Sequence, residues 1–202
     1  MDTRSGEVLA GGVVHKGGIE RIYCVSDELA LSAGSDGRLV IWSLSEPHRL
    51  RTIASSDGAI FAFALLSNAR IAWGEHDGTV RIARLKDLEE LAVFKLHKGT
   101  VTMLSAIWSS EALVSAAHDG RVRVWRPDDG SIVTEMQLDR PLSCGAVAPD
   151  ASALVVGDIS GGVHFLRLSR TNDLSGPNRR SNGVIIQVRV DHLSHRTTPS
   201  HA

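Results

Sequence analysis

Short runs in which apolar and polar residues alternate recur along the chain, and each run follows a tight-turn sequence. Val122 and Val124 alternate with arginines, as do Val80 and Ile82, and a period of two is typical of a strand with one buried face. Asp-Gly pairs at positions 36, 77 and 119 precede three of these runs, and a further apolar stretch precedes each pair. Asp-Gly favours the left-handed backbone of hairpin turns, so each pair predicts two antiparallel strands joined by a turn.

The hairpins belong to a repeat of about 41 residues. The segment Ser35 to Trp42 returns as His76 to Ala83, as His118 to Trp125 and, less clearly, as Ile159 to Leu166. A fixed period of this length indicates one supersecondary unit used repeatedly. Stacked units of this kind present broad binding surfaces, which places the function on a surface rather than in a cleft.

Each repeat contains further strands beside its hairpin. Inner strands are expected near 19–25, 60–65, 101–107 and 142–148, and outer strands of the first three repeats near 50–54, 90–95 and 131–138. Four strands per repeat predict an all-β fold of about four four-stranded antiparallel sheets, each shaped as the blade of a propeller.

Two of the repeats resemble the WD-repeat (WD40) family of β-propellers, whose blades carry a His, a Ser or Thr, a turn Asp and a Trp. The matching residues stand at nearly the same spacing in the first and third repeats: His15, Ser32, Asp36 and Trp42, then His97, Ser115, Asp119 and Trp125. The resemblance implies that each set is a buried hydrogen-bonded network with a structural role.

The other two repeats depart from this pattern. The second has Ala83 in place of the Trp and Trp73 in place of the Ser, so we expect its network to be missing. The fourth has Ser160, Val156 and Leu166 at the Asp, Ser and Trp positions, so we expect apolar packing to hold that blade together.

The number of repeats raises the question of ring closure. The resemblance implies a ring of about seven blades, whereas residues 15–168 supply four. We expect an open or partial propeller, a half ring completed by another chain or by a second copy. A small closed four-bladed ring and a truncated remnant of a longer sensor protein are the alternatives.

Two segments compete for the outer strand of the fourth blade. Residues 7–14 lie within an N-terminal strand region (1–14) that suits a neighbouring or last blade, and residues 184–190 form a second apolar run. The intervening segment 169–183 has the Asn, Ser, Gly and Pro content of a linker, and we expect the chain beyond residue 190 to be a disordered tail.

Composition is that of a cytoplasmic protein with no membrane segment. Hydrophobic residues make up 43% of the chain, the formal net charge is −1, and there is no long apolar run or signal-peptide profile. The two cysteines, Cys24 and Cys144, are too far apart in sequence for a ligand pair, and we expect buried thiols.

Residues for metal, cofactor or nucleic-acid chemistry are not grouped in the sequence. His192, His195 and His201 lie in the tail without a Cys or paired carboxylates, so we expect no metal site. No phosphate-binding glycine loop or nucleophile motif is present, and we expect no cofactor and no enzymatic activity. The tail from residue 167 carries six Arg and two Asp but no Lys and no aromatic residues, so a nucleic-acid partner is not expected.

The resemblance instead implies a protein partner bound at the face that carries the turns. The positions that match this face are Glu20, Phe61, Thr102 and Ser143 at the inner strands and Ser35, His76, His118 and Ile159 beside the turns. Phe61 is the best single anchor because an exposed aromatic ring gains much from a partner, although it equally suits a role in covering the second blade's core.

Two functional hypotheses follow, with enzymatic activity as a third that no motif supports. The first is a noncatalytic interaction scaffold or sensor module, with self-association through open blade edges as one of its modes. The second is the C-terminal segment of a larger signalling ATPase or sensor, because residues 155–168 are similar to the last repeat of propellers that follow nucleotide-switch modules in bacterial signalling proteins.

Overall fold

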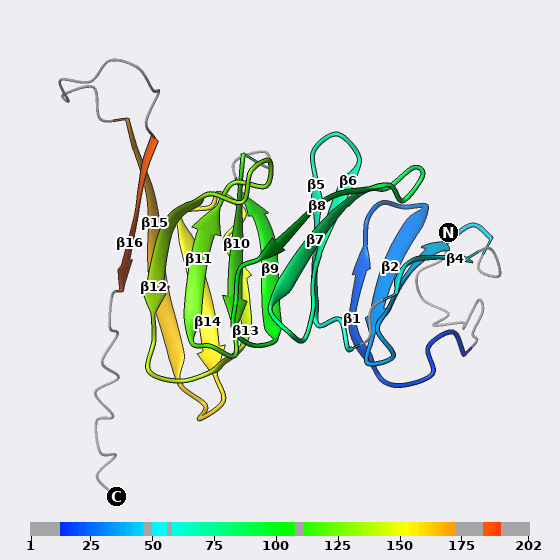
Figure 1. Ribbon diagram of the computed structural model, residues 1–202, viewed down its shortest axis with the longest axis horizontal. Helices are drawn as coiled ribbons and strands as arrows, with labels where there is room; N and C mark the ends of the chain where they lie inside the picture. The colour runs from blue at the N-terminus through cyan, green and yellow to red at the C-terminus, as the bar shows by residue number, and fades with distance from the viewer. Residues whose placement is uncertain (1–12, 47–49, 56–57, 108–110, 173–183, 191–202) are drawn as a thin grey trace, which may run out of the picture.

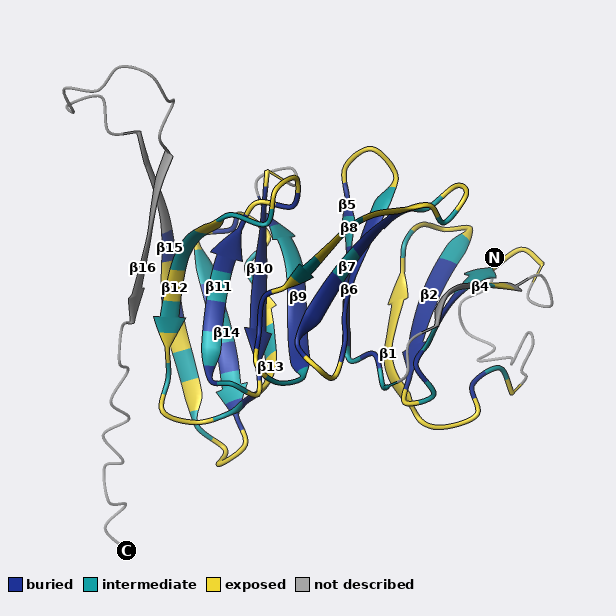
Figure 2. Ribbon diagram, viewed as in Figure 1, coloured by how far each residue is buried: buried dark blue, intermediate teal, exposed yellow. Residues whose placement is uncertain are grey.

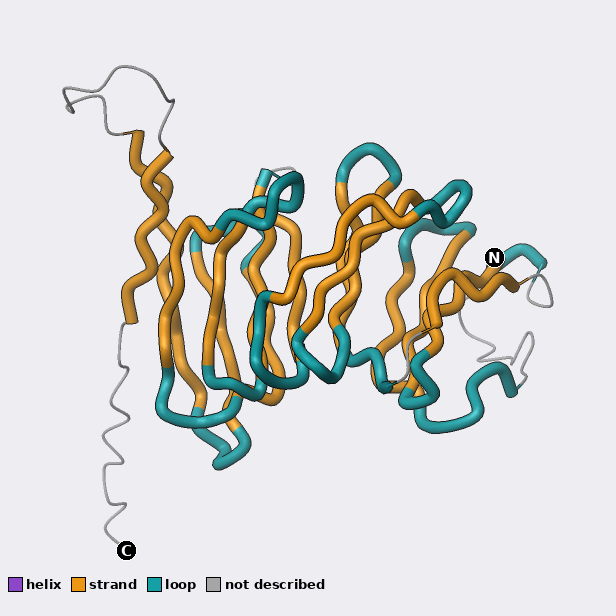
Figure 3. Tube along the Cα trace, in the orientation of Figure 1, coloured by secondary structure: helices purple, strands orange, loops and turns teal. Residues whose placement is uncertain are grey.

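The structure is a computed structural model that describes residues 13–46, 50–55, 58–107, 111–172 and 184–190. It consists of four four-stranded antiparallel sheets, and all regular elements in these residues are strands (Figure 3). This confirms the all-β fold and the four-bladed propeller arrangement expected from the repeats.

Each sheet is a meander in chain order, with its inner strand first. The first sheet is β1 (Ile19–Cys24), β2 (Leu29–Gly34), β3 (Arg38–Ser43) and β4 (Leu50–Ser55), and the second is β5 (Ala62–Leu66), β6 (Arg70–Gly74), β7 (Thr79–Arg84) and β8 (Glu90–Lys95). The third is β9 (Val101–Ile107), β10 (Ala112–Ala117), β11 (Arg121–Trp125) and β12 (Ile132–Gln137). The fourth is β13 (Leu142–Val147), β14 (Ala153–Asp158), β15 (Val163–Asn172) and β16 (Val184–Val190).

The sheets stand face to face in the order of the chain. In Figure 1 the first sheet lies at one end of the long axis, the second lies beside it, and the third and fourth lie toward the other end. Each sheet therefore has a leading face, turned toward the preceding sheet, and a trailing face, turned toward the next. The first and fourth sheets lie at opposite ends, so the arc is open.

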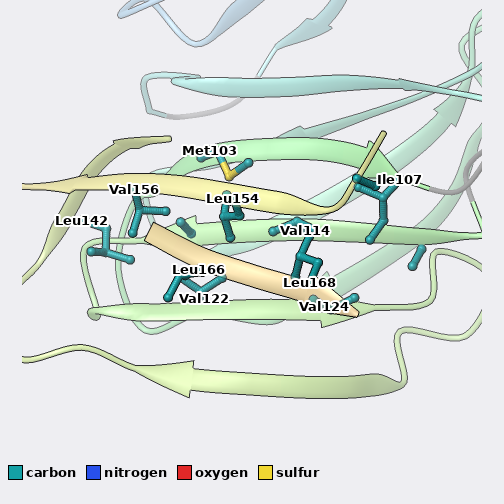
Figure 4. Close-up of a cluster of buried hydrophobic side chains, with 13 residues drawn as sticks. Met103, Ile107, Val114, Val122, Val124, Leu142, Leu154, Val156, Leu166 and Leu168 are labelled. Atoms are coloured by element: carbon teal, nitrogen blue, oxygen red, sulfur yellow. The ribbon is translucent and has the colours of Figure 1, made fainter. Parts of the chain in front are cut away.

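Apolar clusters fill the three joints between neighbouring sheets. Leu31 and Leu39 of the first sheet pack with Ile71 of the second, and Val80 and Ile82 pack with the third sheet. The joint between the third and fourth sheets holds the largest cluster, which Figure 4 shows in close-up. Strands at these joints are buried on both faces, as Figure 2 shows for β6, β7 and β10.

The outer position of the fourth sheet is taken by the second of the two candidate segments. β16 pairs antiparallel with β15, from Leu166 opposite Val190 to Asn172 opposite Val184. Residues 7–12 of the other candidate lie outside the described residues, as does the tail after residue 190.

The hairpin turns depend on glycine at one repeated position. The glycine at this position has a positive φ, between 74° and 91°, in all four blades: Gly37, Gly78, Gly120 and Gly161. This backbone conformation is energetically unfavourable for any residue that has a side chain. The surroundings of these glycines differ. A Cβ on Gly78 would lie 2.1 Å from the His97 carbonyl oxygen, whereas nothing lies within 4 Å of a Cβ on Gly161.

This difference gives a matched pair of substitutions. Gly161→Ala should lower the free energy of unfolding by about 1 to 2 kcal/mol, the cost of left-handed backbone alone. Gly78→Ala should cost clearly more, because the methyl group would collide with backbone that cannot move without disturbing the next blade. Urea denaturation measures both, and equal losses would contradict the tight turn packing at Gly78.

Candidate interaction rim and its supporting polar sets

Four side chains of the first blade form one hydrogen-bonded chain. His15 Nδ1 lies 2.9 Å from Asp36 Oδ1, and His15 Nε2 lies 2.8 Å from Ser32 Oγ. The indole Nε1 of Trp42 donates to the same Ser32 oxygen at 2.8 Å. Because an ionised carboxylate only accepts, Nδ1 carries the proton, Nε2 accepts from the Ser32 hydroxyl, and that hydroxyl accepts from the indole.

The third blade repeats this arrangement in a more buried setting. His97 Nδ1 lies 3.1 Å from Asp119 Oδ1, His97 Nε2 lies 2.7 Å from Ser115 Oγ, and Trp125 donates to Ser115 at 3.2 Å. Ser115 and Trp125 are fully buried, and the Trp125 ring makes an edge contact with Phe94 of the second sheet at 5.7 Å between centroids. The structure thus brings together both sets that the sequence singles out.

Both turn carboxylates are held ionised. Burial opposes ionisation of Asp36, but hydrogen bonds from His15 and from the amides of Lys16 and Arg38 outweigh it and lower its pKa to about 2. The pKa of Asp119 is lowered in the same way: burial is outweighed by the Lys98 amide and by His97. Burial lowers the pKa of His97 despite the neighbouring Asp119, so its imidazole is neutral at pH 7.

The described residues of the second blade contain a different polar set, which was not predicted. Trp73 Nε1 donates to Glu75 at 3.3 Å, and Arg81 Nε donates to the same oxygen at 2.9 Å. Arg81 also reaches Glu90 at 2.7 Å. The signal in the sequence was Glu75 itself, an acid at a position where the first and third repeats have Gly34 and Ala117.

The fourth blade has a carboxylate of its own and does not rely on apolar packing alone. Asp158 accepts hydrogen bonds from the Ser160 and Gly162 amides at 2.8 and 2.9 Å and lies 2.9 Å from His164 Nε2. The contact with His164, followed by the amides, lowers the pKa of Asp158. The acid of this blade therefore stands two residues before position 160, where the repeat pattern predicts it.

A row of glycines supports the residues beside the turns. Gly17, Gly58 and Gly99 recur every 41 residues, and a Cβ on each would contact the side chain of Ser35, His76 and His118 in turn. Thr100 of the same connection donates to the His76 carbonyl at 3.1 Å. The loop that enters each of these blades therefore lies against the hairpin turn of the same blade. We call the surface formed by these loops and turns, with Ser35, His76 and His118 at its centre, the rim.

The residues proposed for partner contact divide into three groups. Six are exposed: Glu20, Ser35, His76, His118, Ser143 and Ile159. Phe61 is half-buried. Thr102 is buried, and its hydroxyl donates to the carbonyls of Ala116 and Leu142, so it ties the third blade to the fourth and does not reach the rim surface.

Cys24 and Cys144 are exposed free thiols, so the expectation of buried thiols is wrong: their strands β1 and β13 lie at the two open ends of the arc.

A hollow of about 270 Å³ lies where β1, β5 and β9 converge, and Arg21 is the one charged residue among those that line it. Within the described ranges no three His, Cys, Asp or Glu side chains group as a metal site, and no helix could cross a membrane.

Comparison with known proteins identifies the repeat. The family described as "WD domain, G-beta repeat" matches residues 88–126. The human angio-associated migratory cell protein is 24% identical over 155 residues, which cover 74% of this chain and 35% of that protein. The yeast (Saccharomyces cerevisiae) target of rapamycin complex subunit LST8 is 23% identical over 129 residues, which cover 63% of this chain and 43% of that protein. This chain thus spans less than half the length of either relative.

A solved structure agrees with the fold. The crystal structure of RRP9 WD40 repeats superposes with a TM-score of 0.65 at 19% identity, over 76% of this chain and 49% of that one. At this identity the likeness concerns the fold alone.

The two buried tryptophans test the polar sets. Trp125→Ala should lower the free energy of unfolding by about 3 to 5 kcal/mol, because it removes a fully buried ring and leaves the Ser115 hydroxyl without its donor. Trp73→Ala should cost less, since Arg81 still pairs with Glu75. Urea denaturation compares them, and equal losses would discredit the difference between the sets.

Stability should also depend on pH through His97. Its pKa in the folded state lies below 6.5, so as the pH falls the unfolded chain binds this proton first. The free energy of unfolding should therefore fall from about pH 6.5 downward, and the loss between about pH 7.5 and about pH 5.5 should be smaller in His97→Gln. In the second blade, burial of Asp77 is outweighed by hydrogen bonds from Lys95 and Thr79, which lower its pKa from 3.8 to about 2, as for Asp36. These two carboxylates should add a second loss of stability as the pH falls from 3.8 to about 2. Equal pH dependence of His97→Gln and wild type would exclude the role given to His97.

Proposed function

We propose that this chain, whose four blades are of the WD40 type, is a noncatalytic protein-interaction module that binds its partner at the rim. The observation that carries the proposal is the row of exposed side chains beside the turns, from Ser35 through His76 to His118, held over glycines of the entering loops. The buried polar sets beneath the row fix the turns, so the rim is preorganised for binding.

The geometry of the polar sets supports a noncatalytic role. Asp36, His15 and Ser32 are linked in the order of a hydrolase triad, but Ser32 has no exposed surface and its oxygen already accepts the Trp42 indole N–H. A hydroxyl in this position cannot meet a substrate. The same holds for Ser115 in the third blade.

Protein partners are further supported by one relative, which is a subunit of a complex. We extend this to the present chain as a proposal, together with a cytoplasmic location based on composition. Binding to the rim would use mixed polar and apolar contacts, with Ile159 and the half-buried Phe61 as the apolar ones.

A second candidate role is that of a C-terminal segment of a larger signalling ATPase or sensor. The chain matches 35% of one relative and 43% of another, which supports only the part of this proposal that concerns a longer protein. Adjacent coding sequence that contains further repeats or a nucleotide-switch module would support this role over that of a separate scaffold.

Rim binding can be tested with two double variants. His76→Ala/His118→Ala removes two exposed rim side chains, and Lys86→Ala/Arg126→Ala removes two exposed cations at the opposite ends of the same hairpins. Proteins that co-purify with the wild type from native cells should be retained by the second variant and reduced about tenfold or more with the first. Equal retention by both variants, each with wild-type thermal stability, would contradict the rim as the binding surface.

A further inference from the structure

The same two positions of each blade are covered by the next blade, except in the fourth. On the trailing faces, Leu39, Val80 and Val122 are at most 1% exposed, whereas the equivalent Val163 is 59% exposed. In the neighbouring row Ile82 and Val124 are 1% exposed, and the equivalent Phe165 is 40% exposed. The fourth sheet thus presents an apolar trailing face without a neighbour among the described residues.

The leading face of the first sheet shows the complementary exposure along its inner strand. Ile22 is 65% exposed, whereas its equivalents Phe63 and Leu104, each 41 residues further on, are 6% and 4% exposed. Cys24 is likewise exposed, where the second blade has the partly buried Leu65. Within the part of the chain that the structure describes, β1 is therefore open on the side where a preceding blade would stand.

We propose that a second copy of this chain closes the ring, with the trailing face of each fourth sheet on the leading face of the other copy's first sheet. Every joint in the structure combines one trailing and one leading face, and the described residues of each chain leave one of each uncovered. Two copies satisfy both at once in a closed twofold arrangement of eight blades, within the range of known propellers. The part of the chain that aligns with a solved chain of WD40 repeats covers 49% of that chain, which agrees with a ring of about twice the four blades seen here.

Side-chain size at the open faces favours this occupant over an unrelated blade. In the three existing joints, the residues equivalent to Phe165 (Ile41, Ile82 and Val124) share a cluster with those equivalent to Cys24 (Leu65, Ala106 and Val147). At the open ends Phe165, the largest side chain of the first series, would meet Cys24, one of the smaller side chains of the second series. Their volumes compensate across the new joint, as close packing requires.

The two cysteines of the chain report on this joint. Cys144 is equivalent to Met103, whose Cγ would lie 3.3 Å from a Cβ on Gly145 of the next blade, and Gly145 is equivalent to Ile22. In the closed ring Cys144 would therefore face Ile22 of the second copy. Cys24 lies two residues further along the same strand, about 7 Å away, which is within reach of a short bis-maleimide.

The test combines molecular mass in solution with cross-linking of the full chain. We expect a dimer by analytical ultracentrifugation and a covalent dimer with bis-maleimide. Cys24→Ser and Cys144→Ser should each fail to cross-link alone but give a covalent dimer when mixed, because each joint needs one thiol of each kind. A monomer, or cross-linking of either variant by itself, would overturn the proposal.

A charge at the open face supplies the second arm. Phe165→Asp should raise the dimer dissociation constant by about 30-fold or more. The control is Ile132→Asp, at a residue of similar exposure (46% against 40%) on β12 of the third sheet, which should leave the dimer unchanged. Equal effects of the two variants would contradict the assigned face. Because the joint faces are distinct from the rim, a monomer that still binds partners would overturn this inference and leave the proposed function intact.

Discussion

The fold depends on the apolar character of both faces of every sheet. A blade of four short strands cannot bury two such faces alone, so each blade is stable only between neighbours. The inner strands show the result: β5 and β9 of the second and third sheets are mostly buried, while β1 and much of β13 are exposed. The hydrogen-bonded sets fix the geometry of the hairpin turns. They are secondary to this requirement, because they do not determine whether neighbouring blades cover the faces of a sheet.

The polar sets show that different residues can supply the hydrogen-bonded carboxylate beside a hairpin turn. Each hairpin has a carboxylate that accepts backbone or side-chain hydrogen bonds near its turn. The first and third blades use Asp36 and Asp119 with a histidine from the preceding loop, the second adds Glu75 with Arg81, and the fourth uses Asp158 with His164. A blade that has lost the family residues is therefore not a blade without a network.

Periodicity in the sequence predicts the architecture well and the exceptions poorly. The 41-residue repeat, the alternation in the strands and the Asp-Gly turns predict the sheets, their order and the WD40 resemblance, all of which are confirmed. Thr102, Cys24 and Cys144 were misjudged because burial depends on which blades have neighbours, and a position in one repeat does not reveal that. Glu75 and Asp158 were missed because they stand outside the family's positions. The likeness of the last repeat to bacterial sensor propellers stays a prediction.

The glycines at 17, 58 and 99 have a consequence for how this surface can change. Because backbone rather than side chains supports the neighbouring positions, the residues there are Ser35, His76 and His118, which differ in size and chemistry. If the rim binds a partner as proposed, substitution in this row should alter recognition with little effect on folding. Such a surface suits rapid evolutionary diversification, and it offers protein engineers regularly spaced sites at which substitutions could introduce a new binding specificity.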